Sequence, residues 1–174
     1  DIAQKFNNDF EVDNFLQVPE PLIQKEFSRI MSLKDGTKKM SKSDPSDLSR
    51  INLTDTKDQI VNKIKKAKTD AKPMPRDDKD LSKRLEAENL LGIYSSLSNQ
   101  SLQNSINEFS GKNFSEFKKN LTELVVEKIT PISNEINKLQ KDNNFIDNIL
   151  KTGGEKAEAI ASKKVHEMKK IIGF

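Results

Sequence analysis

The sequence TKKMSKSDP at residues 37–45 decides how the rest of the chain is interpreted. It holds two lysines three residues apart, Lys39 and Lys42, with small hydroxyl side chains at Ser41 and Ser43. A lysine ammonium group neutralises phosphate oxygens as a compact point charge, and serine adds a donor while letting the backbone approach. The pattern therefore fits a mobile loop that closes on a polyphosphate. Taken alone it is more typical of a solvated basic loop, so the flanking residues decide between the two.

Ordered motifs flank this loop on both sides. RIMSL precedes it at residues 29–33, SRINLTD follows at 49–55, and then come KIKKA at 63–67 and Thr69-Asp70. The centre of the loop, KMSKS at 39–43, resembles the second signature of class I aminoacyl-tRNA synthetases. The complete ordered set is similar to the tryptophanyl-tRNA synthetase family of the bacterial and organellar type. Tyrosine-specific relatives share the loop but not the run from RIMSL to the Thr-Asp pair.

The resemblance extends over essentially the whole chain, from VPEP at residues 18–21 to GGEKAEAIA at residues 153–161. In this family the first ATP signature and the amino-acid pocket lie earlier in the protein. Here the only histidine is His166, and no glycine-rich turn joins a strand to a helix. The resemblance therefore implies the C-terminal half of a synthetase. Apolar residues at positions 2, 3 and 6 predict a helix already under way at Asp1, as expected of a chain that begins inside a helix of the catalytic domain.

The resemblance also implies roles for individual residues. Lys39 and Lys42 are the implied catalytic residues, and Lys42 is expected to act on the departing pyrophosphate. Met40 and Ile30 are expected to contact the adenine side of the nucleotide through their main chains. Gly36 stands where the family usually has proline, which is expected to loosen the hinge ahead of the loop. The full set of implied nucleotide-binding residues is Ile30, Lys39, Met40, Ser41, Lys42 and Ser43. No metal ligands are implied, because Mg²⁺ is carried with ATP.

The implied function is that of a tryptophan–tRNA ligase. Such an enzyme uses ATP to convert tryptophan to tryptophanyl-adenylate, releases pyrophosphate, and transfers the amino acid to tRNA(Trp). The implied partners are tRNA(Trp), tryptophan, ATP and a second copy of the protein in a homodimer. The chain by itself is expected to be inactive. Two alternatives remain open at this point: a noncatalytic, synthetase-derived helical module that binds RNA or acts as an adaptor, and a tyrosine-specific class I relative.

The composition limits the cellular compartments and the kinds of partner that we expect for this chain. The 174 residues are 33% hydrophobic and 33% charged, with a net charge of +3 and no cysteine, which excludes disulfides and thiolate metal sites. No apolar run approaches the length of a membrane span, so a cytoplasmic protein is the expectation, with an organellar address still possible. The positive excess is clearest between Lys57 and Lys72, where six lysines face two aspartates. Lysines in this stretch, among them Lys63, Lys65, Lys66 and Lys68, are candidates for contacts with RNA phosphates.

The expected fold is mainly α. Residues 1–53 are expected to form the C-terminal part of a Rossmann-like catalytic domain that carries the loop, with short strands at residues 15–18 and 29–33. In an open α/β sheet, ligands bind outside the carboxyl ends of strands, which agrees with the place of the loop after the second strand. Residues 54–174 are expected to form an all-helical, anticodon-binding-type domain.

Helical periodicity divides that second region into segments. Asp55 is expected to cap the first helix, whose apolar residues are Ile60, Val61, Ile64 and Ala67. The next helix is expected over residues 81–97, with Leu85, Leu90, Ile93 and Leu97 buried, and Ser101 should cap a short one after it. Pro131 is expected to kink or divide the long helix that begins near Phe114. Gly153-Gly154 is expected to separate a brief helix at residues 145–149 from the last helix, on whose apolar face Lys164 lies.

Overall fold

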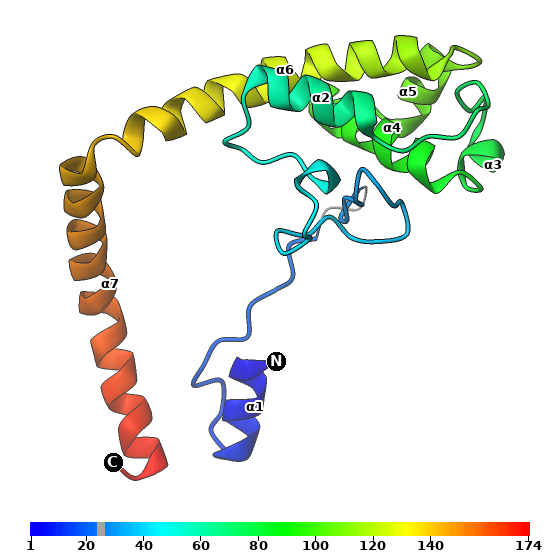
Figure 1. The fold of residues 1–174 in the computed structure, drawn as a ribbon. Helices are drawn as coiled ribbons and strands as arrows, with labels where there is room; N and C mark the ends of the chain where they lie inside the picture. Colours follow the sequence, from blue (N-terminus) through cyan, green and yellow to red (C-terminus); the bar gives the residue numbers. More distant parts are fainter. Residues whose placement is uncertain (24–26) are drawn as a thin grey trace. The chain divides into compact units, whose positions relative to one another are not determined.

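A computed structural model describes residues 1–23 and 27–174 of the chain. The expectation of a mainly α fold is confirmed (Figure 1). In chain order the helical elements of the described residues are α1 (Ile2–Asp9), the short 3₁₀ helix η1 (Asp47–Ser49), α2 (Lys57–Lys66), α3 (Asp78–Leu81), α4 (Leu85–Ser98), α5 (Leu102–Phe109), α6 (Phe114–Leu139) and α7 (Asn143–Ile172). None of these helices is both long enough and apolar enough to cross a membrane.

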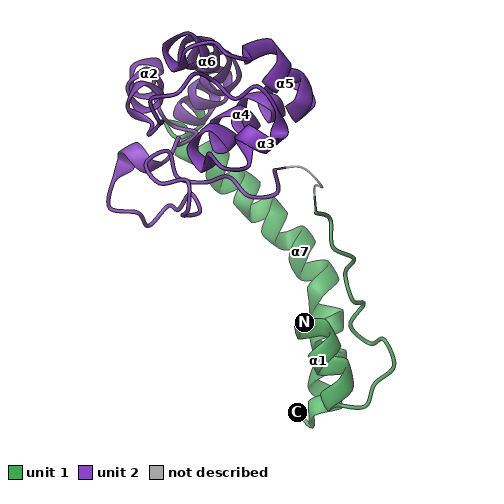
Figure 2. Ribbon diagram, turned by 90° about the vertical axis from the view of Figure 1, so that its right-hand side faces the viewer, with its two compact units in different colours: residues 1–23, 139–174 green, residues 24–138 purple. Residues whose placement is uncertain are grey.

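The chain divides into two compact units (Figure 2). Unit 1 contains residues 1–23 and 139–174, and unit 2 contains residues 24–138. Unit 2 therefore holds most of the helices and also the loop at residues 37–45, which we call the lysine loop. The predicted domain boundary between residues 53 and 54 falls inside unit 2 and stays a prediction, because a compact unit and a functional domain are different divisions.

The two predicted strands do not form. Across residues 1–23 and 27–174, the only β pairing is a single antiparallel bridge between Met31 and Lys39. Residues 15–18 are irregular, and residues 29–33 are extended only around that bridge. A strand is stabilised by the ladder of its neighbours, and these segments have no neighbouring strand in the described part of the chain.

The helices α2, α4 and α5 of unit 2 lie along α6 (Figures 1 and 2). Their shared core contains two edge-to-face aromatic pairs. The ring centroids lie 4.8 Å apart in the pair of Tyr94 and Phe109, and 4.9 Å apart in the pair of Phe109 and Phe117. Such pairs add roughly 0.5–1.5 kcal/mol each to the burial of their surface. Other core side chains include Ile60, Ile64, Leu90, Leu91, Ile106, Leu121 and Val125, all almost completely buried.

Two of the predicted helix starts need correction. The N-cap of α2 is Thr56, not Asp55: the Thr56 side chain accepts from the Gln59 N–H, and the Gln59 side chain accepts from the Thr56 N–H, which is a complete capping box. Leu85 was expected to be buried but is 43% exposed, because α4 begins there rather than at residue 81. Ser101 caps α5 as predicted, by accepting from the Asn104 N–H.

Neither of the last two helices is divided where a break was expected, whereas the kink expected at Pro131 stays a prediction. α6 runs through Pro131, and α7 runs through Gly153 and Gly154 without a break. Each glycine costs about 1 kcal/mol relative to alanine in a helix interior. In a helix of 30 residues the remaining backbone hydrogen bonds continue on both sides of the pair, so two such residues weaken α7 without ending it.

Unit 1 is held mainly by aromatic contacts. The Lys164 Nζ of α7 lies 3.8 Å from the centroid of the Phe15 ring, so this lysine covers an aromatic face as a cation–π partner. The Phe15 ring in turn lies 5.8 Å from that of Phe6 in α1. The amide of Asn7 exchanges two hydrogen bonds with the backbone of Leu16, at 2.8 and 2.9 Å, which fixes the chain after α1.

Candidate functional site

The entrance to the lysine loop is pinned by backbone hydrogen bonds. Beside the bridge between Met31 and Lys39, the Ser32 N–H donates to the Lys38 carbonyl at 2.8 Å, and the Met40 N–H donates to the Ile30 carbonyl at 3.0 Å. The last bond brings together Ile30 and Met40, the two residues expected to contact adenine. It also occupies the N–H of Met40, so a ligand that approaches the main chain of Met40 meets its carbonyl oxygen.

A side chain that sequence reasoning did not single out holds the segment before the loop. The buried Asn89 of α4 accepts from the Met31 N–H and donates to the Met31 carbonyl, both at 2.9 Å. It therefore takes the place that a neighbouring strand would have. The sequence does contain a signal for this role: Asn89 is a polar amide that stands between the apolar residues Ala87 and Leu90, both of which are buried. Such an amide needs partners of its own inside the protein.

The turn ahead of the loop is close-packed rather than loose. A Cβ atom added at Gly36 would lie 2.9 Å from the carbonyl carbon of Leu85, so this residue touches the first turn of α4. The Asp35 carboxylate accepts from the Thr37 N–H at 3.1 Å and from the Thr37 hydroxyl at 2.6 Å. These hydrogen bonds hold the pKa of Asp35 below its ordinary value. Gly36 is thus closely packed, and the expectation of a looser hinge there stays a prediction.

Of the predicted phosphate-binding residues, Lys39 belongs to this pinned entrance, and Ser41, Lys42 and Ser43 follow it. Lys39, Ser41, Lys42 and Ser43 are all exposed, whereas Met40 is half-buried. The Ser41 hydroxyl lies 3.0 Å from the Ser43 hydroxyl and accepts from the Ser43 N–H at 3.3 Å. Two ammonium groups and two hydroxyls within five consecutive exposed or half-buried residues form a donor set that fits anionic oxygens.

An apolar cavity of about 180 Å³ lies next to the loop. Ile30 and Met40 line it on the loop side, and Ile93 and Val125 line it from α4 and α6. Among the described residues, its lining contains no charged side chain. The described lining therefore offers no charged partner to the ammonium or carboxylate of an amino acid, and its one polar side chain is that of Ser96.

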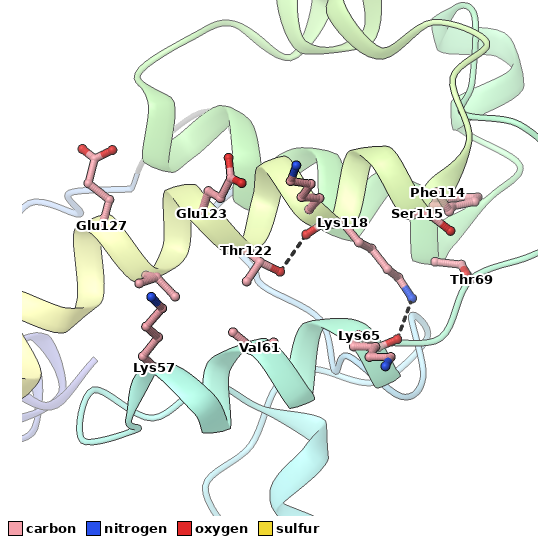
Figure 3. Close-up of a pocket in the computed structure, with 12 residues that line it drawn as sticks. Lys57, Val61, Lys65, Thr69, Phe114, Ser115, Lys118, Thr122, Glu123 and Glu127 are labelled. Atoms are coloured by element: carbon pink, nitrogen blue, oxygen red, sulfur yellow. Dashed lines mark hydrogen bonds between the residues drawn. The ribbon is translucent and has the colours of Figure 1, made fainter.

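A second feature of unit 2 is a groove of about 800 Å³ between α2 and α6 (Figure 3). Lys57 and Lys65 of α2 and Lys118 and Lys119 of α6 line it, and Val61 gives it an apolar floor. We call it the basic groove. It also contains the carboxylates of Glu123 and Glu127.

Lys118 has a structural task in this groove. Its Nζ donates to the carbonyls of Lys65 at 3.2 Å and Ala67 at 2.6 Å, at the C-terminal end of α2 (Figure 3). A cation in that position satisfies carbonyls that have no partner within the helix. Burial lowers the pKa of Lys118 below the ordinary lysine value.

The lysines predicted to meet RNA lie in different environments. Lys63 is 2% exposed and cannot reach an RNA phosphate, so its assignment as a phosphate contact is wrong. Lys68 binds Glu86 at 2.7 Å. Lys65 and Lys66 are exposed, and of these two only Lys65 lines the basic groove.

Comparison with known proteins finds relatives that all belong to one group of tRNA synthetases. The family described as tRNA synthetases class I (W and Y) matches residues 1–130. A tryptophan–tRNA ligase of Caulobacter vibrioides is 48% identical over 174 residues, and one of Agrobacterium fabrum is 49% identical over 192 residues. Each match covers 100% of this chain, but only 51% and 54% of the respective relatives. The chain thus spans about half the length of the curated relatives it matches.

Solved structures agree in fold. A tryptophanyl-tRNA synthetase from Mycoplasma pneumoniae superposes with a TM-score of 0.80 at 28% identity, covering 99% of this chain and 51% of that protein. One from Campylobacter jejuni, solved in complex with ADP and tryptophan, gives a TM-score of 0.66 at 24% identity over 99% of this chain and 51% of that protein. The second likeness concerns the fold alone.

Proposed function

We infer the function from one premise: this chain belongs to the class I tRNA synthetases of the W and Y group. We propose that it is the C-terminal half of a tryptophan–tRNA ligase and carries the KMSKS half of the ATP site. The observation that supports this most strongly is the lysine loop: a pinned entrance that includes Lys39, followed by an exposed turn with Lys42.

In the proposed reaction the carboxylate of tryptophan attacks the α-phosphorus of ATP. A bond forms between a carboxylate oxygen and the α-phosphorus. The bond from the α-phosphorus to the oxygen that bridges to the β-phosphate breaks, and pyrophosphate leaves with that electron pair. Negative charge therefore grows on the leaving group, and donors that tighten as it departs lower the barrier. Lys39 and Lys42, with the hydroxyls of Ser41 and Ser43, are the proposed donors. Mg²⁺ enters as part of the ATP substrate.

The specificity of this reaction can be tested in the full-length protein. Exchange of labelled pyrophosphate into ATP is expected to depend on tryptophan and not on tyrosine. The motivating observation is the run of relatives at 48–49% identity that are tryptophan–tRNA ligases. Exchange that depends on tyrosine would establish the tyrosine-specific alternative. Absence of exchange with either amino acid would favour a noncatalytic adaptor.

We propose, separately, that the full-length protein is a homodimer. We further propose that the helical part of unit 2 binds tRNA(Trp) and that the basic groove contacts the phosphate backbone of this tRNA. Lys57, Lys65 and Lys119 supply three ammonium groups around an apolar floor. Phosphate contacts of this kind position RNA without reading its sequence. Lys118 is left out of the contact set because its ammonium group already serves the end of α2.

Replacing Lys57, Lys65 and Lys119 together with alanine is expected to weaken cognate and noncognate tRNA alike. The slope of log affinity against log salt should become shallower by about 2–3, at roughly 0.7–0.9 for each phosphate that is no longer neutralised. Filter binding of the full-length protein to tRNA, at a series of salt concentrations from low to moderate, measures both the affinity and its salt slope. The matched control is Lys79→Ala/Lys83→Ala/Lys138→Ala, which removes equal charge from outside the groove. An equal weakening of binding in the two triple variants would show that only net charge matters.

A further inference from the structure

Lys63 is a buried lysine whose role the proposed function leaves unexplained. It belongs to the KIKKA motif, whose other lysines, Lys65 and Lys66, are exposed. Its ammonium group lies 2.6 Å from the Asp55 carboxylate and 2.7 Å from the Asp47 carboxylate. The Lys63 side chain is 3% exposed and that of Asp55 4%. Burying a lysine requires partners of opposite charge, so this geometry is specific rather than incidental.

The cluster around Lys63 is electrically balanced. Arg50 Nη2 lies 3.0 Å from Asp47 Oδ1, so two cations face two carboxylates. The amide of Asn52 donates to both carboxylates, to Asp47 at 2.9 Å and to Asp55 at 3.2 Å. The hydrogen bond from Lys63 is the main reason that the pKa of Asp47 lies below its ordinary value. We call these five residues the charge clip.

The charge clip ends on the lysine loop. Arg50 Nη1 donates to the carbonyl of Asp44 at 2.9 Å, and Asp44 is the residue directly after Ser43. A continuous path therefore runs from Lys63 through Asp47 and Arg50 to the backbone at the exit of the loop. The entrance is fixed independently, by the hydrogen bonds at Met31 and Met40. Hydrogen bonds therefore hold the loop on both sides of Ser41, Lys42 and Ser43.

We propose that Lys63 is a positioning residue: through Asp47 and Arg50 it fixes the exit of the lysine loop, so that Lys42 meets the departing pyrophosphate at the correct distance. This inference rests on the proposed function. Lys63 does not touch the nucleotide and acts only through the two residues between it and Asp44. A misplacement of about 1 Å in a catalytic group can lower a rate by about 100-fold.

The test is tryptophan-dependent pyrophosphate–ATP exchange by the full-length protein with Lys63→Met. The expected result is a kcat lowered about 10- to 100-fold, with the KM for tryptophan changed by less than about threefold because the amino acid does not contact the clip. Lys83→Met, which removes an exposed lysine of the same unit, should retain wild-type kinetics. Wild-type kinetics in Lys63→Met would overturn the inference. Absence of exchange in the wild-type protein would instead overturn the proposed function.

A second variant separates positioning from stability. Lys63→Met leaves Asp55 buried without its cation, whereas Lys63→Met/Asp55→Asn removes that imbalance and still leaves Asp47 without Lys63. The double variant is expected to recover most of the thermal melting temperature while kcat stays low. Recovery of both quantities, or a kcat in the single variant that falls only with the unfolded fraction, would reduce Lys63 to a structural residue and overturn the proposal.

Discussion

Lys42→Ala in the full-length protein is expected to slow formation of tryptophanyl-adenylate by about 100- to 1,000-fold, as when other preorganised transition-state donors are removed. The Lys42 ammonium group is exposed on the turn between the pinned entrance and the charge clip. Its charge is needed chiefly when pyrophosphate departs, so the effect should appear in the chemical step while tryptophan binding changes little. Single-turnover measurement of adenylate formation gives the rate of that step directly.

The matched control for this experiment is Lys38→Ala in the same segment. Lys38 Nζ lies 3.6 Å from Asp35 and belongs to the turn ahead of the loop. Because this exposed pair does not reach the proposed phosphate site, its removal should leave the chemical step within a few-fold of wild type. A chemical step unchanged in Lys42→Ala, or slowed equally in both variants, would reduce Lys42 to a surface lysine.

The sequence predicted those parts of the fold that depend on local chemistry. The Ser101 cap was found where it was expected, and of the predicted stripe Ile60, Ile64 and Ala67 are buried, whereas Val61 is 39% exposed. Each follows from residue type and spacing within a few positions. The family resemblance placed the loop in its functional context.

The sequence did not predict features that depend on distant contacts. Lys63 and Lys65 look alike in the motif, but only Lys63 lies beside Ile60 and Ile64 on the buried face, where Asp47 and Asp55 fold back to meet it. Its place next to that stripe was a usable signal. The role of Asn89 depends on a backbone segment 58 residues earlier, which periodicity cannot reveal. The expected break at Gly153 and Gly154 is a different case: each glycine carries only a modest cost, which does not end a helix of 30 residues.

The second large effect concerns this chain on its own, which is expected to show no tryptophan-dependent exchange above background. It contributes phosphate donors on an exposed loop, but the described lining of the cavity beside that loop is apolar and has no charged group for an amino acid. The chain also spans only 51% of its Caulobacter vibrioides relative. Without a bound carboxylate held near the α-phosphorus, the advantage of proximity disappears, and with it an effective molarity of about 10⁵ M or more.

The most direct test of the account is therefore pyrophosphate–ATP exchange measured side by side on this 174-residue chain and on the full-length protein, at equal concentration, with and without tryptophan. We expect exchange that requires tryptophan in the full-length protein, and none in the chain. Robust tryptophan-dependent exchange by the chain alone would contradict the assignment of this chain as half of the active site.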